Sequence, residues 1–340
     1  MSRRVVWRAV YALALAGALA PIPGWTVERW YSQAFYPLLQ RVLTPASNGV
    51  PFALFDLLWV GAVAATAVAG YRCIRSAGWR VGAVRFVTYV ARAVALTYIV
   101  FLVTWGLNYR RVPLIDRLAF DPARVTRAAA SQLGDANADT LNALYARAHA
   151  APASIESLAV AFQDAVRALG ATRPVVAGRP KPTLLGGYFH QTAVAGMTDP
   201  FLLETLIAPD LLDVERPFVI AHEWAHLAGY ADESEANFVA WLTCRRGDAA
   251  AQYSAALALL GYANPRKPLN VALDLGPQVD VFTIAYRYSR TNETLRFAAR
   301  QGYDKFLKAN RVERGVESYD AVVQLILGTG LDVRGNPLFR

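Results

Sequence analysis

Hydrophobic residues are concentrated in the first third of this 340-residue chain, where they form long runs rather than periodic stripes. Residues 52–71 carry one charge, Asp56, and residues 86–107 carry one charge, Arg92. Each run has the length of about 20 residues that an α-helix needs to cross the hydrocarbon core of a bilayer. A third apolar segment, residues 5–21, precedes them. We therefore expect about three transmembrane helices in a membrane region over residues 1–110.

The arginines around these segments predict their orientation. The first segment resembles a secretory signal peptide, but Pro21 would follow the cleavage site, which favours an uncleaved anchor. Arginines precede this segment and crowd the loop 72–85, so the positive-inside rule places both in the cytoplasm. Arg110 and Arg111 oppose this assignment. We expect a multi-pass protein of the inner (cytoplasmic) membrane with its soluble domain on the extracytoplasmic side.

After residue 110 the pattern changes to shorter periodic segments separated by glycine and proline. Helical spacing covers residues 122–150 and 154–169, and a Gly-containing, β-favouring stretch over 183–203 predicts a small strand pair. Further helices are expected over residues 218–229, 232–245 and 247–261, and in the C-terminal third. Residues 111–340 therefore predict a mainly helical α+β domain that follows the transmembrane helices.

The composition of the chain limits the classes of partner that it can bind. The net charge of +9 comes from scattered arginines rather than a continuous basic run, which argues against nucleic acid and favours a lipid bilayer. Cys73 and Cys244 are too few for a disulfide framework or a thiolate zinc site. Residues 21–51 carry aromatic side chains at helical spacing, which fits either an interfacial helix or a loop packed on the domain.

His222, Glu223 and His226 form an H-E-x-x-H pattern inside a predicted helix. Residues four apart share one helix face, so both imidazoles can reach a single ion. Zinc binds histidine nitrogens readily and keeps an open position for water in catalytic sites. Glu223 lies about 100° around the helix from His222, where it can take a proton from that water. The pattern predicts a zinc ion held by His222 and His226, with Glu223 as the catalytic base.

The third zinc ligand is left open among three carboxylates at the start of the next helix. Glu233 is favoured, because Asn237 lies one turn further on and could orient a ligand histidine. Glu235 is the rival, although apolar residues share its face. Asp232 is the third candidate by its spacing from His226. For each of them the simple alternative is an acidic residue that complements the helix dipole.

Residues outside the motif carry weaker hypotheses. His190 lies in a different segment and is not expected to bind zinc. An extended substrate could bind along the strand before the metal helix, where Gly196 allows close approach, although a purely structural hairpin is as plausible. Candidates for stabilising an oxyanion in the reaction are Tyr188, His190, Tyr303 and Tyr319.

The motif and its surroundings resemble a known bacterial family, catalogued as domain of unknown function 3810. The resemblance rests on "HEWAHLAGYADESEANFVAWL", the preceding "GGYF" and the late "FLKANRVERGVESYDAVVQLIL", and it covers nearly the whole chain. It implies a membrane-anchored, zincin-like protein in which the H-E-x-x-H residues and the Glu233/Glu235 pair fall on the family motif. Members usually carry Lys or Arg where this chain has Asp232, which weakens Asp232 as a ligand.

These observations predict a membrane-anchored zinc metallopeptidase of the gluzincin type. It would hydrolyse peptide bonds of an unidentified peptide or protein with a zinc-activated water and Glu223 as general base. Two alternatives keep the site: a non-proteolytic zinc-binding sensor or assembly factor of the envelope, and a zinc amidase acting on cell-wall fragments. Glu223 favours an enzyme over the sensor, because a purely structural zinc site has no use for a base.

Overall fold

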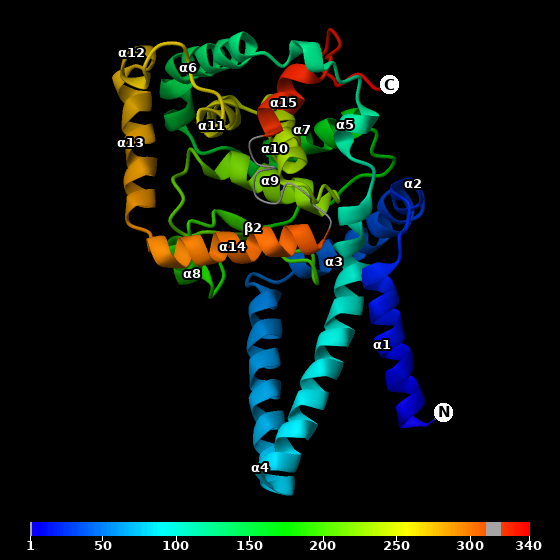
Figure 1. The fold of residues 1–340 in the computed structure, drawn as a ribbon. Coiled ribbons are helices and arrows are strands. Elements are labelled where there is room, and N and C mark those ends of the chain that lie inside the picture. The colour runs from blue at the N-terminus through cyan, green and yellow to red at the C-terminus, as the bar shows by residue number, and fades with distance from the viewer. Residues whose placement is uncertain (1, 311–320) are drawn as a thin grey trace.

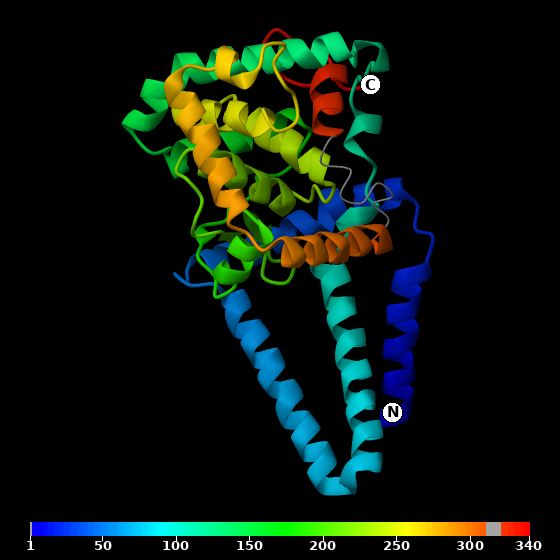
Figure 2. The same cartoon turned by 60° about the vertical axis from the view of Figure 1, so that its left-hand side comes forward.

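The computed structural model describes residues 2–310 and 321–340 as a helical domain that stands on long helices (Figure 1). Two helices extend from one side of the domain, α1 (Arg3–Leu19) and α4 (Leu54–Thr104). The N-terminus lies at the far end of α1, and a view turned by 60° shows the same separation from the domain (Figure 2). The apolar first third of the sequence is thus set apart from the rest.

Gly78 divides α4 into two arms that fold back on one another. Its φ of 71° lies in the left-handed region, which glycine adopts without the steric cost of a side chain. The arms approach closely beyond this turn, because a Cβ atom on Gly82 would lie only 2.6 Å from the carbonyl oxygen of Cys73. The apolar runs predicted over 52–71 and 86–107 are these two arms.

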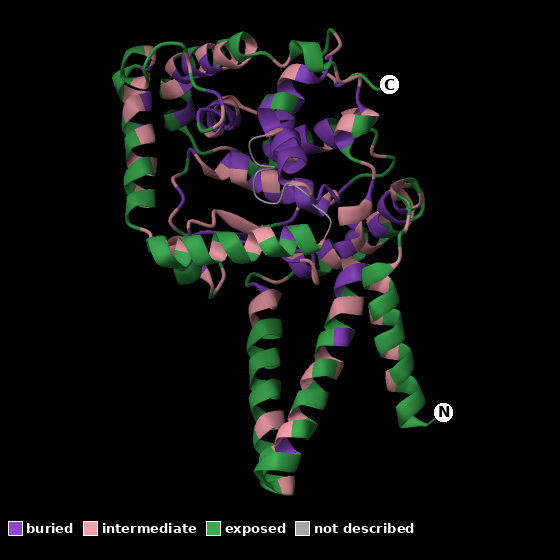
Figure 3. Cartoon of the chain, viewed as in Figure 1, coloured by how far each residue is buried: buried purple, intermediate pink, exposed green. Residues whose placement is uncertain are grey.

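The apolar side chains of both arms are largely exposed (Figure 3). Leu57, Val84 and Val94 are 59%, 67% and 62% exposed. Among the described residues, α4 is the helix that is long and apolar enough to cross a membrane. The first helix meets the same test only when it is joined, across a bend of 115°, to Gly24–Asn48. The number of crossings therefore stays a prediction.

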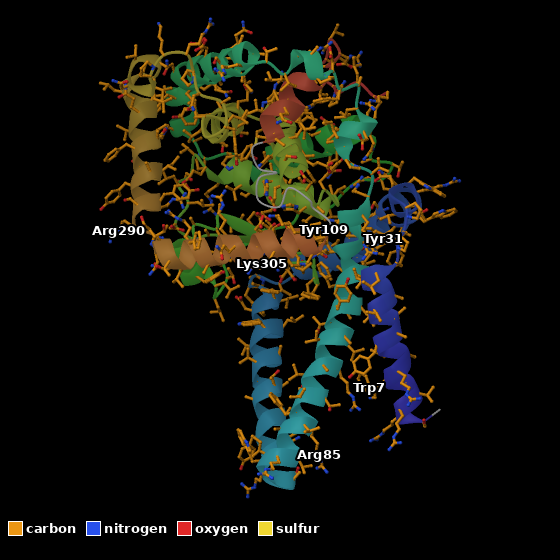
Figure 4. All side chains as sticks on the ribbon, in the orientation of Figure 1. Trp7, Tyr31, Arg85, Tyr109, Arg290 and Lys305 are labelled. Carbon is orange, nitrogen blue, oxygen red and sulfur yellow. The ribbon has the colours of Figure 1, made fainter. Side chains whose placement is uncertain are left out.

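The first helix packs along the second arm of α4. The guanidinium of Arg92 lies 4.7 Å from the centre of the Trp7 ring, a cation–π contact. Near the domain, a Cβ atom on Gly17 would lie 2.7 Å from Leu102 Cδ1. Figure 4 shows Trp7 beside this arm and Arg85 near the tip of the hairpin, far from the domain. Gly17 thus allows the two helices to approach closely, and Trp7 fills the space between them further along.

The helical segment after α1 packs onto the domain. It consists of α2 (Gly24–Val27), the π-helical η1 (Glu28–Phe35) and α3 (Tyr36–Asn48). The Tyr36 hydroxyl donates a hydrogen bond to the carbonyl oxygen of Leu227 over 2.9 Å, and Thr44 Oγ1 donates to Leu203 over 3.1 Å. Tyr36 belongs to the same hydrophobic core as the domain, and Thr44 is fully buried. The segment therefore joins the two long helices firmly to the domain.

The remaining helices build the domain in chain order. They are η2 (Gly106–Arg110), α5 (Leu114–Arg117), η3 (Pro122–Arg124), α6 (Arg127–Ala150), α7 (Ile155–Ala168), α8 (Gly186–Thr192), α9 (Arg216–Leu227), α10 (Glu233–Cys244), α11 (Ala249–Leu259), α12 (Leu269–Ala272), α13 (Leu275–Ser289), α14 (Glu293–Ala309) and α15 (Ala321–Gly328). The α9–α10 pair lies at the centre, and every residue of α10 is buried. The predicted mainly helical domain is confirmed.

A small sheet lies beside α9, with strands in the order β1-β3-β2. Its strands are β1 (Pro180–Lys181), β2 (Gly196–Thr198) and β3 (Thr205–Ile207). The pair β2–β3 is antiparallel, and β1 runs parallel to β3. The α+β class therefore holds, with β2 as an edge strand.

Part of the stretch expected to form strands is helical instead. Residues 186–192 form α8, which buries Phe189 in the core and ends at Ala193 with a left-handed φ of 59°. Local β-propensity is a weak preference, and burial of one helix face outweighs it here. Only β2 lies within the predicted stretch, and its partner β3 follows just after the end of it.

Candidate metal centre

The turn between α9 and α10 sets the geometry of the site. Gly229 follows the end of α9 with a φ of 82°, and the amide of Tyr230 closes the turn on the carbonyl oxygen of Ala225. Asp232 then caps α10, because its side chain accepts hydrogen bonds from the amides of Ser234 and Glu235. The reversal lays the first turn of α10 against the histidine face of α9.

Three side-chain atoms converge at this contact. His222 Nε2 lies 3.1 Å from His226 Nε2, and Glu233 Oε2 lies 3.2 Å from the first nitrogen and 3.6 Å from the second. The three residues form the group among the described residues whose ligand atoms could hold a metal ion. Two ligands about 2.1 Å from a tetrahedral zinc ion lie about 3.4 Å apart, so the triangle has the size that zinc requires.

The other nitrogen of each imidazole fixes its tautomer. His222 Nδ1 lies 2.8 Å from Asn237 Oδ1, and His226 Nδ1 lies 2.7 Å from the carbonyl oxygen of Tyr230. Both oxygens accept hydrogen bonds, so each Nδ1 carries a proton and each Nε2 presents a lone pair. Two nitrogen lone pairs and a carboxylate oxygen therefore point at one place.

The cluster attracts positive charge. Burial lowers the pKa of His226, but the adjacent Glu233 carboxylate raises it to about 9. Burial raises the pKa of Glu233, yet the two histidines hold it well below its usual value. Bare, such a site binds a proton tightly, and a divalent cation satisfies all three lone pairs at once. The donor set of two imidazoles and a carboxylate fits zinc.

Glu223 lies beside this cluster and is not part of it. Its side chain is buried against β2, where Thr198 Oγ1 donates a hydrogen bond of 2.8 Å to Glu223 Oε2. A Cβ atom on Gly196 would lie 2.7 Å from Glu223 Oε1, so any larger residue there would displace the Glu223 side chain. Burial raises the pKa of this carboxyl group above its usual value, although the nearby histidines partly offset the effect. The carboxylate is thus held between the edge strand and the histidines.

The two other carboxylates considered as zinc ligands lie elsewhere. Glu235 points away from the histidines, and its carboxylate accepts a hydrogen bond from the amide of Leu114. Burial raises the pKa of Glu235 to about 7. Asp232 is occupied as the helix cap. Among the three candidates, the structure brings Glu233 to the histidines.

The family model for proteins of unknown function (DUF3810) matches residues 31–327. The chain belongs to this family. The match includes the second and third apolar segments, the sheet, the α9–α10 pair and α14. The comparisons with curated proteins and with solved structures found no match. Membership of DUF3810 assigns no activity to the chain.

Two aromatic residues contact the site from distant parts of the DUF3810 chain. The Tyr303 hydroxyl, on α14, donates a hydrogen bond to Glu233 Oε1. Trp105 Nε1, at the end of α4, donates to the carbonyl oxygen of His226 over 3.1 Å. The sequence places Tyr303 among possible oxyanion partners and gives no sign of a contact with Glu233. Trp105 reads simply as part of an apolar run.

The remaining sequence candidates do not join the cluster. His190 Nδ1 lies 2.7 Å from Asp210 Oδ2, away from the metal-binding group. Tyr188 is half exposed on α8. Tyr319 lies outside the described residues.

Proposed function

We propose that this protein is a membrane-anchored zinc metallopeptidase whose metal is held by His222, His226 and Glu233. The observation that carries the proposal is the triangle of three metal-facing atoms, 3.1 to 3.6 Å apart, with a buried carboxylate beside it on the same helix. A structural zinc site has no need of that fourth group. Hydrolysis gives Glu223 a role.

Zinc, when bound, polarises a carbonyl oxygen and lowers the pKa of water to about 7. Glu223 takes the proton from the attacking water and passes it to the leaving nitrogen. Its Oε2 is held by Thr198, so Oε1 is the atom that carries the proton. Asn237 and the Tyr230 carbonyl hold the two imidazoles in the tautomer that this site requires.

The edge strand β2 offers a place for an extended peptide. Ala195 accepts a backbone hydrogen bond from Ala208 and Asp199 donates one to Glu204, so the backbone groups of Gly196 and Thr198 point to the outer edge. A substrate that adds to this edge as a further strand would lie next to Glu223. Strand addition recognises the peptide backbone, which favours a peptidase over a hydrolase of other amides.

The arrangement of the long helices supports three crossings with the domain outside. The N-terminus and the tip of the α4 hairpin lie at the same end of the molecule, away from the domain (Figures 1 and 4). Both ends are rich in arginine, with Arg3 and Arg4 at one and Arg80 and Arg85 at the other. The positive-inside rule places that end in the cytoplasm.

The test is zinc content by elemental analysis together with hydrolysis of a quenched fluorescent peptide library. The full chain in detergent is compared with Glu223→Gln, Glu233→Gln and Glu235→Gln. We expect about one zinc per chain in the wild type, Glu223→Gln and Glu235→Gln, and loss of zinc in Glu233→Gln. Hydrolysis should persist in Glu235→Gln, the matched control, and disappear in the other two variants.

Each other outcome has a definite meaning. A folded wild-type protein without zinc overturns the metal site. Zinc binding with no peptide hydrolysis overturns the peptidase and leaves a zinc-binding sensor or, if cell-wall fragments are cleaved, an amidase.

A further inference from the structure

An open cavity of about 530 Å³ lies between α8 and α14. Its lining includes Tyr188 from α8 and, from one face of α14, Leu295, Ala299, Gly302, Tyr303 and Phe306. Cavities of about 300 to 1,000 Å³ are typical of sites that bind small ligands. The volume falls within this range, and the hollow is open at the surface of the domain.

The sequence of α14 explains why the cavity exists. Its lining residues recur at helical spacing, so they form one stripe, and two of them, Ala299 and Gly302, are small. A Cβ atom on Gly302 would meet no heavy atom within 4 Å. Within α14 only Leu307 is fully buried. The helix thus lies across the domain and lines the cavity with an uncharged, mainly apolar face.

The groove leads to the metal centre at one point. Tyr303 lines it, and the hydroxyl of the same side chain donates to Glu233 Oε1. A molecule in the groove therefore touches a residue that contacts a proposed metal ligand. Through this contact, a molecule bound in the groove would lie close to the proposed metal site.

The groove also lies at the membrane side of the domain. Phe306 packs its ring 6.1 Å from that of Phe101 and 5.9 Å from that of Tyr109, where the second arm of α4 enters the domain. Figures 1 and 2 show α14 lying across the domain at the level where α1 and α4 leave it, and Figure 4 labels Tyr109 close to it. A chain anchored in the bilayer would meet this face first.

We propose that the groove between α8 and α14 is the specificity pocket of the enzyme. It takes a large apolar side chain of a polypeptide that approaches from the membrane surface. The inference rests on the proposed function, because it supplies that site with its substrate class: membrane-anchored polypeptides with an apolar residue near the cleaved bond.

Binding of two peptide hydroxamates tests the pocket without requiring turnover. The probes differ only in one side chain, phenylalanine or glycine, and their affinity is measured by fluorescence polarisation on the zinc-loaded full chain in nanodiscs. We expect the phenylalanine probe to bind about 10- to 100-fold more tightly, the value of burying one such side chain. Gly302→Leu fills the groove and should abolish this preference. Gln301→Leu places the same leucine side chain at a neighbouring position outside the lining and should preserve the preference.

The outcomes separate the two proposals. Absence of zinc, or of binding by either hydroxamate, overturns the metallopeptidase itself. Equal affinity for both probes, or a preference that survives Gly302→Leu, overturns the pocket and leaves the enzyme intact. A palmitoylated form of the phenylalanine probe, tethered in the nanodisc, should bind as well; its exclusion while the free probe binds overturns the approach from the membrane.

Discussion

At the scale of single residues, the orientation of the His222 and His226 rings depends on the hydrogen bonds that their Nδ1 atoms make. Asn237 Oδ1 holds His222 Nδ1 over 2.8 Å, and the Tyr230 carbonyl oxygen holds His226 Nδ1 over 2.7 Å. One support is a side chain and the other is backbone, so only the first can be removed by substitution. Such hydrogen bonds fix ring orientation and raise the basicity of the ligating nitrogen.

Replacing Asn237 should therefore weaken zinc binding without removing a ligand. We expect Asn237→Leu, which is similar in size, to raise the zinc dissociation constant about 10- to 100-fold. Asn237→Asp keeps an acceptor at the same place and should stay close to the wild type. The constant is measured by competition with a chelator of known affinity. Equal affinity in all three proteins would show that His222 is oriented by something else.

The sequence could name the histidines and could not choose the third ligand. Glu233 and Glu235 are two positions apart on one helix, so they point to nearly opposite sides of it. Which side meets the histidines is decided by the turn at Gly229 and by the cap at Asp232, and these are tertiary features. Tyr303 lies 70 residues from Glu233, and no local pattern predicts that contact.

At the scale of elements, the edge strand positions the proposed base. Gly196 faces Glu223 so closely that a Cβ atom would lie 2.7 Å from Oε1. The sequence predicted a strand pair here, and the structure adds that its outer strand lies against α9. The sequence pattern could not predict α8, because burial of Phe189 rather than local propensity stabilises that helix.

Gly196→Ala should displace the base and spare the metal. We expect kcat to fall about 100-fold, the usual cost of moving a catalytic group by about 1 Å, with zinc content unchanged. Gly187→Ala is the matched control, because a Cβ atom there meets no heavy atom within 4 Å. Steady-state hydrolysis and elemental analysis measure the two quantities. Full activity in Gly196→Ala would remove Glu223 from the role of base.

A second set of contacts joins the segment after α1 to the end of α9. Arg111 Nε donates to Glu28 Oε2 over 2.9 Å, and Arg111 Nη1 donates to the carbonyl oxygen of Gly229 over 2.9 Å. Burial raises the pKa of Glu28, but Arg111 and Arg117 outweigh it and lower the pKa below its usual 4.5. A lowered folded-state pKa stabilises the protein above the unfolded value, and this stabilisation is lost as the pH falls through the folded value.

Glu28→Gln should thus destabilise the protein at neutral pH and less so in acid. We expect the free energy of unfolding to fall by about 3 kcal/mol at pH 7, because a buried arginine loses its partner. The difference from the wild type should shrink as the pH falls below about 4.5. Urea unfolding in detergent micelles measures it. Asp164→Asn breaks an exposed pair with Arg167 and should change stability by less than about 1 kcal/mol; an equal loss in both variants would contradict a special role for Glu28.

At the scale of the whole molecule, the apolar first third and the helical domain are joined into one body. Tyr36 and Thr44 lie in the core of the domain, although they precede the α4 hairpin in the chain. The boundary predicted at residue 110 follows the change in hydropathy along the chain. It therefore assigns these two residues to the membrane region, although they pack in the domain. Long apolar runs in the sequence identify candidate membrane spans. The packing of the mixed polar and apolar segment 24–48 depends on tertiary contacts, which the sequence pattern does not predict.

The orientation of this body in the membrane is open to a direct test. In a Cys73→Ser background the remaining Cys244 is fully buried, so a new surface cysteine is the site that a maleimide reaches. Arg80→Cys lies near the hairpin tip and Arg167→Cys on α7, where the Arg167 side chain is 72% exposed. The positive-inside rule predicts that a membrane-impermeant maleimide labels Arg167→Cys in spheroplasts and labels Arg80→Cys only after lysis. The reverse pattern would place the metal centre in the cytoplasm, and equal labelling of both in spheroplasts would show that the hairpin does not cross. With the predicted pattern, the groove beneath α14 lies on the outer side of the membrane, where the proposed polypeptide substrates would have to be displayed.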